Sequence, residues 1–152
     1  MRLNWQKGVP HTQGLPTKKQ GMVWIKAVLE HLQQPECELC VRLVSSDEMT
    51  TLNHLYRGKN KPTNVLSFKA NVPPRSGPVL LGDMVICPEV VRQEAIAQGK
   101  PLEAHFAHMV IHGTLHLLGY DHTQEAEAAQ MEALEVTLLS TLGIDNPYKE
   151  AR

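Results

Sequence analysis

Three histidines near the end of one helical segment place the tightest constraint on how this chain can fold. Within residues 105–116, four histidines recur at steps of three, four and four, which puts all of them on one stripe of an α-helix. His112 and His116 lie one turn apart and can share an ion at about 2.0–2.1 Å from each ring. Gly119 can end the helix in the left-handed conformation, so that His122 returns toward them. The spacing predicts a metal site at the end of a helix, with His112, His116 and His122 as ligands.

Three protein ligands leave the fourth position of a tetrahedral zinc ion open, which is typical of catalytic zinc. Such an ion lowers the pKa of bound water toward ~7 and supplies hydroxide, so the pattern favours a hydrolase with one Zn²⁺ per chain. Nickel or cobalt would accept the same nitrogens. The alternative is a set of buried histidines without metal, but three imidazoles beside Leu115, Leu117 and Leu118 are costly to bury without a shared partner.

The residue after His112 separates two kinds of zinc hydrolase. Metzincin proteases have the pattern H-E-x-x-H-x-x-G-x-x-H and use its glutamate as general base. Gly113 stands at that position here, and it has no side chain that can move a proton. Glycine also costs helix stability, and we expect it to open space beside the metal for a bulky substrate. A metalloprotease-like hydrolase is therefore the less favoured interpretation.

The rest of the chain alternates between helical and extended patterns. Apolar residues at three- and four-residue steps predict helices, and alternating apolar residues predict strands. The expected helices cover residues 18–33, 47–57, 88–99, 101–118 and 123–142, and the expected strands cover residues 1–5, 39–43, 65–68 and 79–87. No repeat and no long linker divides the chain. The pattern predicts an α+β fold with one domain over residues 1–152, in which about five helices cover a small mixed sheet of about four strands.

Length and composition agree with one globular unit. A chain of 152 residues with 42% hydrophobic residues can bury a core, and its net charge of −1 gives no general reason to bind a membrane. No apolar stretch is long enough to cross a bilayer, and the first thirty residues lack a signal-peptide pattern. Three cysteines are too few for a disulfide scaffold, so we expect a cytoplasmic protein. Cys37 and Cys40 have the spacing of a redox or zinc pair, but no second pair exists and we assign them no function.

Basic residues gather in one part of the chain. No Asp or Glu occurs from residue 49 to residue 82. That stretch carries Arg57, Lys59, Lys61, Lys69 and Arg75. It could face phosphates, and a solvated basic loop is the alternative. Arg57 comes first in it, and a guanidinium suits phosphate because it can make bidentate contacts.

Residues 112–122, with the sequence His-Gly-Thr-Leu-His-Leu-Leu-Gly-Tyr-Asp-His, match the H-G-x-L-H-L-x-G-Y-D-H signature of the bacterial YbeY family of rRNA maturation factors. Residues 52–68 and 81–87 resemble the same family, and the resemblance covers about residues 38–142. It implies a metal-dependent, single-strand-specific endoribonuclease that acts in 16S rRNA 3′-end maturation and ribosome quality control. It also implies zinc at the three histidines, a role for Arg57 in the cleft, and the small ribosomal subunit and its assembly factors as partners.

The sequence departs from the family pattern at two positions. Asn64 stands where Asp is usual, and Lys69 follows Phe68 where Pro is common. A carboxylate at position 64 therefore has no catalytic role here, and we name no general base beyond the metal site. Asp121 could hydrogen-bond a ligand imidazole or serve as a turn residue beside Gly119.

Two further histidines lie on the same helical stripe. His108 could sit in the cleft beside the metal or reach an RNA phosphate, and a buried, hydrogen-bonded histidine is the alternative. For His105 the buried interpretation is favoured.

Two hypotheses for the function remain open at this point. The leading one is cleavage of RNA phosphodiester bonds at a three-histidine metal centre, with Arg57 holding phosphate. The other is a ribosome-assembly factor that binds rRNA and uses a mainly structural zinc, because metal binding can itself supply folding free energy.

Overall fold

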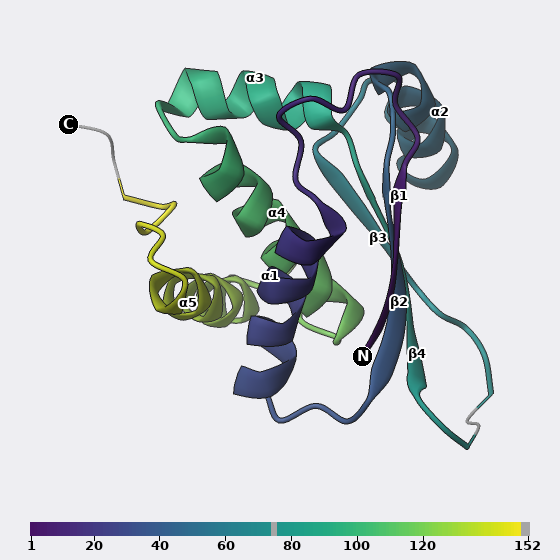
Figure 1. Ribbon diagram of the computed structural model, residues 1–152, viewed down its shortest axis with the longest axis vertical. Helices are drawn as coiled ribbons and strands as arrows, with labels where there is room; N and C mark the ends of the chain where they lie inside the picture. Colours follow the sequence, from purple (N-terminus) through teal and green to yellow (C-terminus); the bar gives the residue numbers. More distant parts are fainter. Residues whose placement is uncertain (74–75, 150–152) are drawn as a thin grey trace.

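The computed structural model describes residues 1–73 and 76–149 of the chain. In this part the fold is α+β, with one four-stranded mixed sheet and five helices (Figure 1). The elements in chain order are β1 (Arg2–Lys7), α1 (Lys18–His31), β2 (Cys37–Leu43), α2 (Ser46–Arg57), β3 (Val65–Lys69), β4 (Val79–Ile86), α3 (Pro88–Gln98), α4 (Leu102–Leu117) and α5 (Glu125–Thr141). The fold class expected from the sequence is confirmed, and each expected element occurs with boundaries shifted by a few residues.

The sheet has the strand order β1-β2-β4-β3. β1 and β4 both run parallel to β2, whereas β3 pairs antiparallel with β4 and forms the other edge. The first strand is therefore an edge strand. Residues 64–67, at the start of this edge strand, line the same pocket as His112, His116 and His122.

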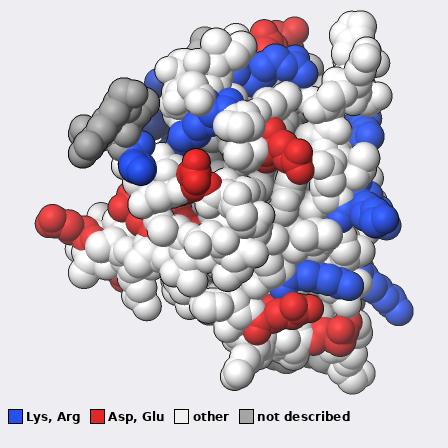
Figure 2. Space-filling model, turned by 60° about the vertical axis from the view of Figure 1, so that its left-hand side comes forward, with Lys and Arg blue, Asp and Glu red and all other residues white. Residues whose placement is uncertain are grey.

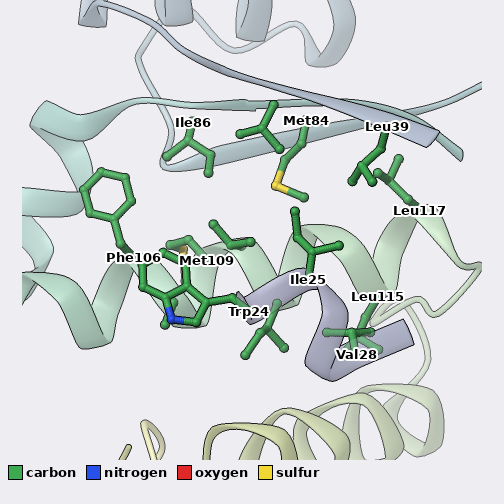
Figure 3. Close-up of a cluster of buried hydrophobic side chains, with 14 of the residues drawn as sticks. Trp24, Ile25, Val28, Leu39, Met84, Ile86, Phe106, Met109, Leu115 and Leu117 are labelled. Atoms are coloured by element: carbon green, nitrogen blue, oxygen red, sulfur yellow. The ribbon is translucent and has the colours of Figure 1, made fainter. Parts of the chain in front are cut away.

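Both faces of the sheet carry helices, but unequally. Figure 1 shows α1 and α4 against one face, with α3 and α5 packed around α4, while α2 lies on the opposite side. The main core lies between the sheet and α1 and α4; Figure 3 shows Met84 and Ile86 of the sheet pointing toward Ile25 and Phe106 of the helices. A smaller cluster around Met49 joins α2 to the other face of β3 and β4.

Helix α4 lies at the centre of the fold. It contacts α1, α3, α5, β3 and β4, and most of its residues from His105 to Leu117 are buried. A helix that is apolar on almost every side must be covered on every side, which explains why α4 is surrounded. Its C-terminal turn carries the histidine pair to the edge of β3, so the core of the protein fixes the position of the candidate site.

None of the five helices in the described residues combines the length and the apolarity needed to cross a membrane. The three cysteines of the chain are all unpaired thiols. Cys37 and Cys40 lie on β2, and their odd spacing of three residues points their side chains to opposite faces of the sheet. This geometry agrees with assigning no redox pair to them.

Candidate metal centre

The three predicted histidine ligands converge at the C-terminal end of α4. The ring centroids lie 4.7 Å apart for His112 and His116, 4.9 Å for His116 and His122, and 5.7 Å for His112 and His122. One ring nitrogen from each residue lies within 4.8 Å of the other two. Among the described residues this is the one such group of three or more His, Cys, Asp or Glu side chains that could hold a metal ion.

The turn after α4 brings His122 back to the helix. Gly119 has φ 102°, a left-handed conformation that glycine adopts without steric cost, and its N–H donates to the carbonyl of His116 at 3.0 Å. Asp121 then accepts a 2.6 Å hydrogen bond from the N–H of His122 and a 3.3 Å hydrogen bond from the hydroxyl of Thr123. Asp121 therefore acts as a turn residue that shapes the loop. Of the two roles considered for it, this is the one that its hydrogen bonds support.

The nitrogen positions suit one tetrahedral ion. His116 Nε2 and His122 Nδ1 are 3.1 Å apart. Two ligands of a tetrahedral zinc at about 2.0–2.1 Å would lie about 3.3 Å from each other. Burial lowers the pKa of His116 to about 4, with a further contribution from the neighbouring His112 and His122 rings. At neutral pH the His116 ring is therefore uncharged and offers a lone pair, which a metal ligand needs.

A buried carboxylate that the sequence analysis did not identify lies behind this group. Glu135 of α5 is fully buried, and its Oε1 accepts hydrogen bonds from His112 Nδ1 at 2.9 Å and from His108 Nε2 at 3.0 Å. The hydroxyl of Tyr148 donates to its other oxygen at 2.7 Å. Burial by itself would raise the pKa of Glu135, but the hydrogen bonds from the two histidines outweigh it and lower the pKa to about 2.

Glu135 had a signal in the sequence. It occupies an inward position of α5, in line with Met131, Leu138 and Leu139, where the pattern calls for an apolar residue. A carboxylate on an apolar stripe indicates a polar partner inside the protein, since an unpaired buried charge is very costly. Which partner it has could not be read from the spacing, because α5 and α4 meet only in the folded chain.

His105 and His108 are buried residues outside the metal group. His105 Nε2 lies 3.0 Å from Glu94, and both rings line a separate cavity of about 360 Å³ beside the C-terminal segment. Their Nδ1 atoms have no hydrogen-bond partner among the described residues. The buried interpretation therefore holds for His105, whereas His108 contacts the site through Glu135 and through an edge-on contact with the His112 ring, with centroids 6.3 Å apart.

Arg57 and the three histidines line one cleft of about 330 Å³. The cleft is lined by Arg57, Thr63, Asn64, Val65, Leu66, Ser67, His112, His116 and His122. Arg57 ends α2, its side chain is exposed, and it has no ion-pair partner within residues 1–73 and 76–149. The lining contains no Asp or Glu, so an anionic ligand would meet cationic or neutral groups here.

Three other basic residues of the acid-free stretch do not line this cleft. Lys59, Lys61 and Lys69 are exposed elsewhere, and Arg75 lies outside the described residues. On the face drawn in Figure 2, most of the surface is uncharged, and the blue and red side chains lie in small separate groups. Among the residues that line the cleft, Arg57 is the one Lys or Arg.

Gly113 has a different role from the one expected. A Cβ at this position would lie 2.7 Å from Sδ, 2.8 Å from Cε and 3.0 Å from Cγ of Met84, all far closer than normal contacts. The absent side chain therefore makes room for Met84 of β4, and the expectation that it opens space beside the metal is wrong. The close approach is also marked by a 3.2 Å hydrogen bond from the Ser67 hydroxyl to the carbonyl of Gly113.

Asn64 has a defined place at the edge of the cleft. Its side-chain N–H donates to both oxygens of Glu94, at 3.1 and 3.2 Å, and its own oxygen accepts from the N–H of Val65 at 2.7 Å. An aspartate here would place a carboxylate against Glu94. The amide therefore fits this chain, although the family pattern has Asp at the position.

Comparison with known proteins shows the family and the fold of this chain. Residues 11–143 match the model of the family described as endoribonuclease YbeY. The fold is similar to the solution structure of TM1509 from Thermotoga maritima, with a TM-score of 0.57 and 22% sequence identity over 97% of this chain and 99% of that chain. At this level of identity the likeness concerns the fold alone.

Proposed function

Because the chain belongs to the YbeY endoribonuclease family, we propose that it is a metal-dependent, single-strand-specific endoribonuclease that acts in 16S rRNA 3′-end maturation and ribosome quality control. RNA cleavage and rRNA maturation are properties of the family. The metal dependence is supported by one observation in particular: a three-histidine group that could hold a metal shares its cleft with the unpaired guanidinium of Arg57.

We assign one Zn²⁺ per chain to His112, His116 and His122. Three imidazole nitrogens and an open position are the ligand set of catalytic zinc, and the short distance between the nitrogens of His116 and His122 fits a common ion. Zinc held there would supply Lewis acidity and an acidified water, with a pKa near ~7, to a phosphodiester. Nickel or cobalt would fit the same nitrogens, and metal analysis distinguishes them.

Arg57 is the proposed phosphate-binding residue. Its guanidinium presents a planar set of donors that matches two phosphate oxygens, and it remains charged at any physiological pH. The cleft lining offers no carboxylate that would compete for it or repel RNA. In this assignment Arg57 orients the scissile phosphate beside the three histidines, and all four residues are catalytic in the sense that they contact substrate or metal.

Membership of the family supports the proposed substrate and partners. We propose unpaired segments of the 16S rRNA precursor as substrate, the small ribosomal subunit and its assembly factors as partners, and the cytoplasm as location. The unpaired thiols of Cys37, Cys40 and Cys87 are consistent with a reducing compartment. Residues 1–152 are proposed to work as one metal-dependent hydrolase domain.

The test combines metal analysis with cleavage of a defined single-stranded 16S rRNA fragment. We expect about one zinc per wild-type chain, loss of zinc and of cleavage in His116→Ala, and loss of cleavage with retained zinc in Arg57→Ala. Arg92→Ala is the matched control, because Arg92 is exposed on α3 and does not line the cleft. Undiminished cleavage by chelator-treated protein would contradict the proposal and point to a contaminating nuclease.

The same variants separate the assembly-factor hypothesis. If Arg57→Ala binds zinc normally, cleaves nothing and still restores rRNA processing in cells, the zinc is mainly structural and the protein acts by binding. If Arg57→Ala loses rRNA processing in cells together with RNA cleavage, the nuclease assignment stands.

A further inference from the structure

A single buried oxygen connects the candidate ligand His112 to His108, one turn earlier on helix α4. Oε1 of Glu135 lies 2.9 Å from His112 Nδ1 and 3.0 Å from His108 Nε2, while the Tyr148 hydroxyl lies 2.7 Å from Oε2. The Glu135 side chain has no exposed surface, whereas 24% of His112 is exposed toward the cleft. The carboxylate thus accepts hydrogen bonds from three donors and has no contact with solvent.

Packing alone does not require a carboxylate at this position. An apolar residue of similar volume would complete the inward face of α5, and replacing buried ionic groups by well-packed apolar ones is often neutral or stabilising. A polar group in such a place fits a role beyond filling space. The group it contacts most directly on the cleft side is His112.

The hydrogen bonds determine which nitrogens carry hydrogen. An ionised carboxylate only accepts, so His112 Nδ1 and His108 Nε2 must both donate. His112 therefore presents Nε2, with its lone pair, as the atom available to the cleft. Nδ1 of His108 then carries the lone pair, and it has no hydrogen-bond partner among the described residues.

We propose that Glu135 is a positioning residue for the metal centre: it holds His112 in the tautomer and orientation that direct Nε2 at the ion. The inference rests on the proposed metal site and adds a residue to it. The carboxylate also places a negative charge one ring away from the ion, which raises the basicity of the ligand imidazole. Oriented carboxylate–histidine pairs of this kind typically change metal affinity about 10–100-fold.

Tyr148 and His108 keep the carboxylate in place. The Tyr148 hydroxyl occupies the oxygen that His112 leaves free, and His108 approaches the shared oxygen from the neighbouring turn of α4. Burial, together with the hydrogen bond to Glu135, raises the pKa of Tyr148 above its ordinary value, so the hydroxyl remains a donor. The C-terminal segment that carries Tyr148 is thereby tied to the metal centre.

The test measures zinc affinity by chelator competition in Glu135→Gln, which keeps the shape of the side chain. Glu132→Gln is the matched control, because Glu132 is an exposed acid on the same helix. We expect the zinc dissociation constant to rise about 10–100-fold in Glu135→Gln and to stay unchanged in Glu132→Gln. Tyr148→Phe keeps both contacts between Glu135 and the imidazoles, so its zinc affinity should fall less than that of Glu135→Gln.

A second readout does not depend on any variant that might unfold. Long-range ¹H–¹⁵N spectra of metal-free wild-type protein report the tautomer of His112, and we expect Nδ1–H. An Nε2–H tautomer there, or a Glu135→Gln affinity within about twofold of wild type, overturns the inference. If wild-type protein binds no zinc at all, the proposed metal site fails first, so the two failures are distinguishable.

Discussion

Gly113 offers a test of how closely helix α4 must approach the sheet. In Gly113→Ala the new methyl group would lie 2.7 Å from Met84 Sδ and 2.8 Å from Cε, and both atoms belong to a fully buried side chain. Figure 3 shows Met84 pointing from β4 into the helix layer, toward Ile25. The methionine end is flexible, but its Cγ also lies at 3.0 Å, so rotation of the terminal atoms alone does not relieve the contact.

Two opposing terms set the size of the effect. Alanine in a helix interior is more favourable than glycine by about 1 kcal/mol. Overpacking a close-packed core costs about 1–3 kcal/mol. We therefore expect Gly113→Ala to destabilise the protein by about 1 kcal/mol in net. In a Met84→Ala background the clash is absent, and the same substitution should stabilise by up to about 1 kcal/mol.

The assay is a double-mutant cycle by urea unfolding in the presence of chelator, which removes any contribution of metal binding to the measured free energy. Met84→Ala alone should cost about 2–5 kcal/mol because it leaves a cavity. The coupling free energy between the two sites should be about 1–3 kcal/mol. The effect of Gly113→Ala on the free energy of unfolding should change sign, from destabilising in the wild-type protein to stabilising in Met84→Ala. If Gly113→Ala stabilises the wild-type protein as much as it stabilises Met84→Ala, the close approach does not constrain residue 113 and the reasoning is refuted.

Three further predictions concern other parts of the fold. Asn64→Asp should lower the free energy of unfolding by about 1–3 kcal/mol, because two carboxylates would then face each other, and the loss should shrink in the double variant with Glu94→Gln. An equal loss with and without Glu94→Gln would contradict the contact. Gly82→Ala should lower the free energy of unfolding by about 3 kcal/mol or more and Gly58→Ala by only about 1 kcal/mol. Gly82 combines φ 140° with a backbone oxygen 2.1 Å from the added Cβ, whereas the Cβ at Gly58 would meet open space. Thermal melts that rank the two variants in reverse would refute this reasoning. Burial raises the pKa of Cys87 above the ordinary 9.0, so the unfolded chain loses this proton first and stability should fall as pH rises past that value. The contribution of Cys87 is the difference between the wild-type protein and Cys87→Ala in the slope of unfolding free energy against pH. Ellman's reagent should label Cys87 only when the protein unfolds.

The parts of the structure that were predictable from the sequence are those that depend on neighbours in the chain. Helix α2 ends at Gly58 with φ 69°, directly after the predicted last residue, because left-handed glycines act within a few residues, whereas its N-cap is Ser45 and it begins one residue earlier than predicted. The histidine group follows the same rule. His112, His116 and His122 are ten residues apart at most, and a helix followed by one turn is enough to bring them together.

The parts that were missed depend on contacts between distant segments. The spacing of Glu135 marked it as unusual, yet its partner His112 lies 23 residues earlier, and only the packing of α5 on α4 brings the two together. Gly113 was misinterpreted for the same reason. Its neighbour Met84 belongs to another element, and nothing within the helix indicates that a strand side chain occupies the space.

These two contacts act on the histidine pair from opposite sides, which connects the core to the chemistry. Met84 sets the distance of α4 from the sheet at the residue between His112 and His116, while Glu135 sets the orientation of the His112 ring from α5. A shift of the helix by a few tenths of an ångström would move both rings, and metal affinity is sensitive to ligand placement at that scale. Gly113→Ala should therefore weaken zinc binding as well as stability, and relief of the clash by Met84→Ala should restore the affinity. If the double variant recovers stability but not zinc affinity, the two effects are separate, and contacts other than those of the core position the metal ligands.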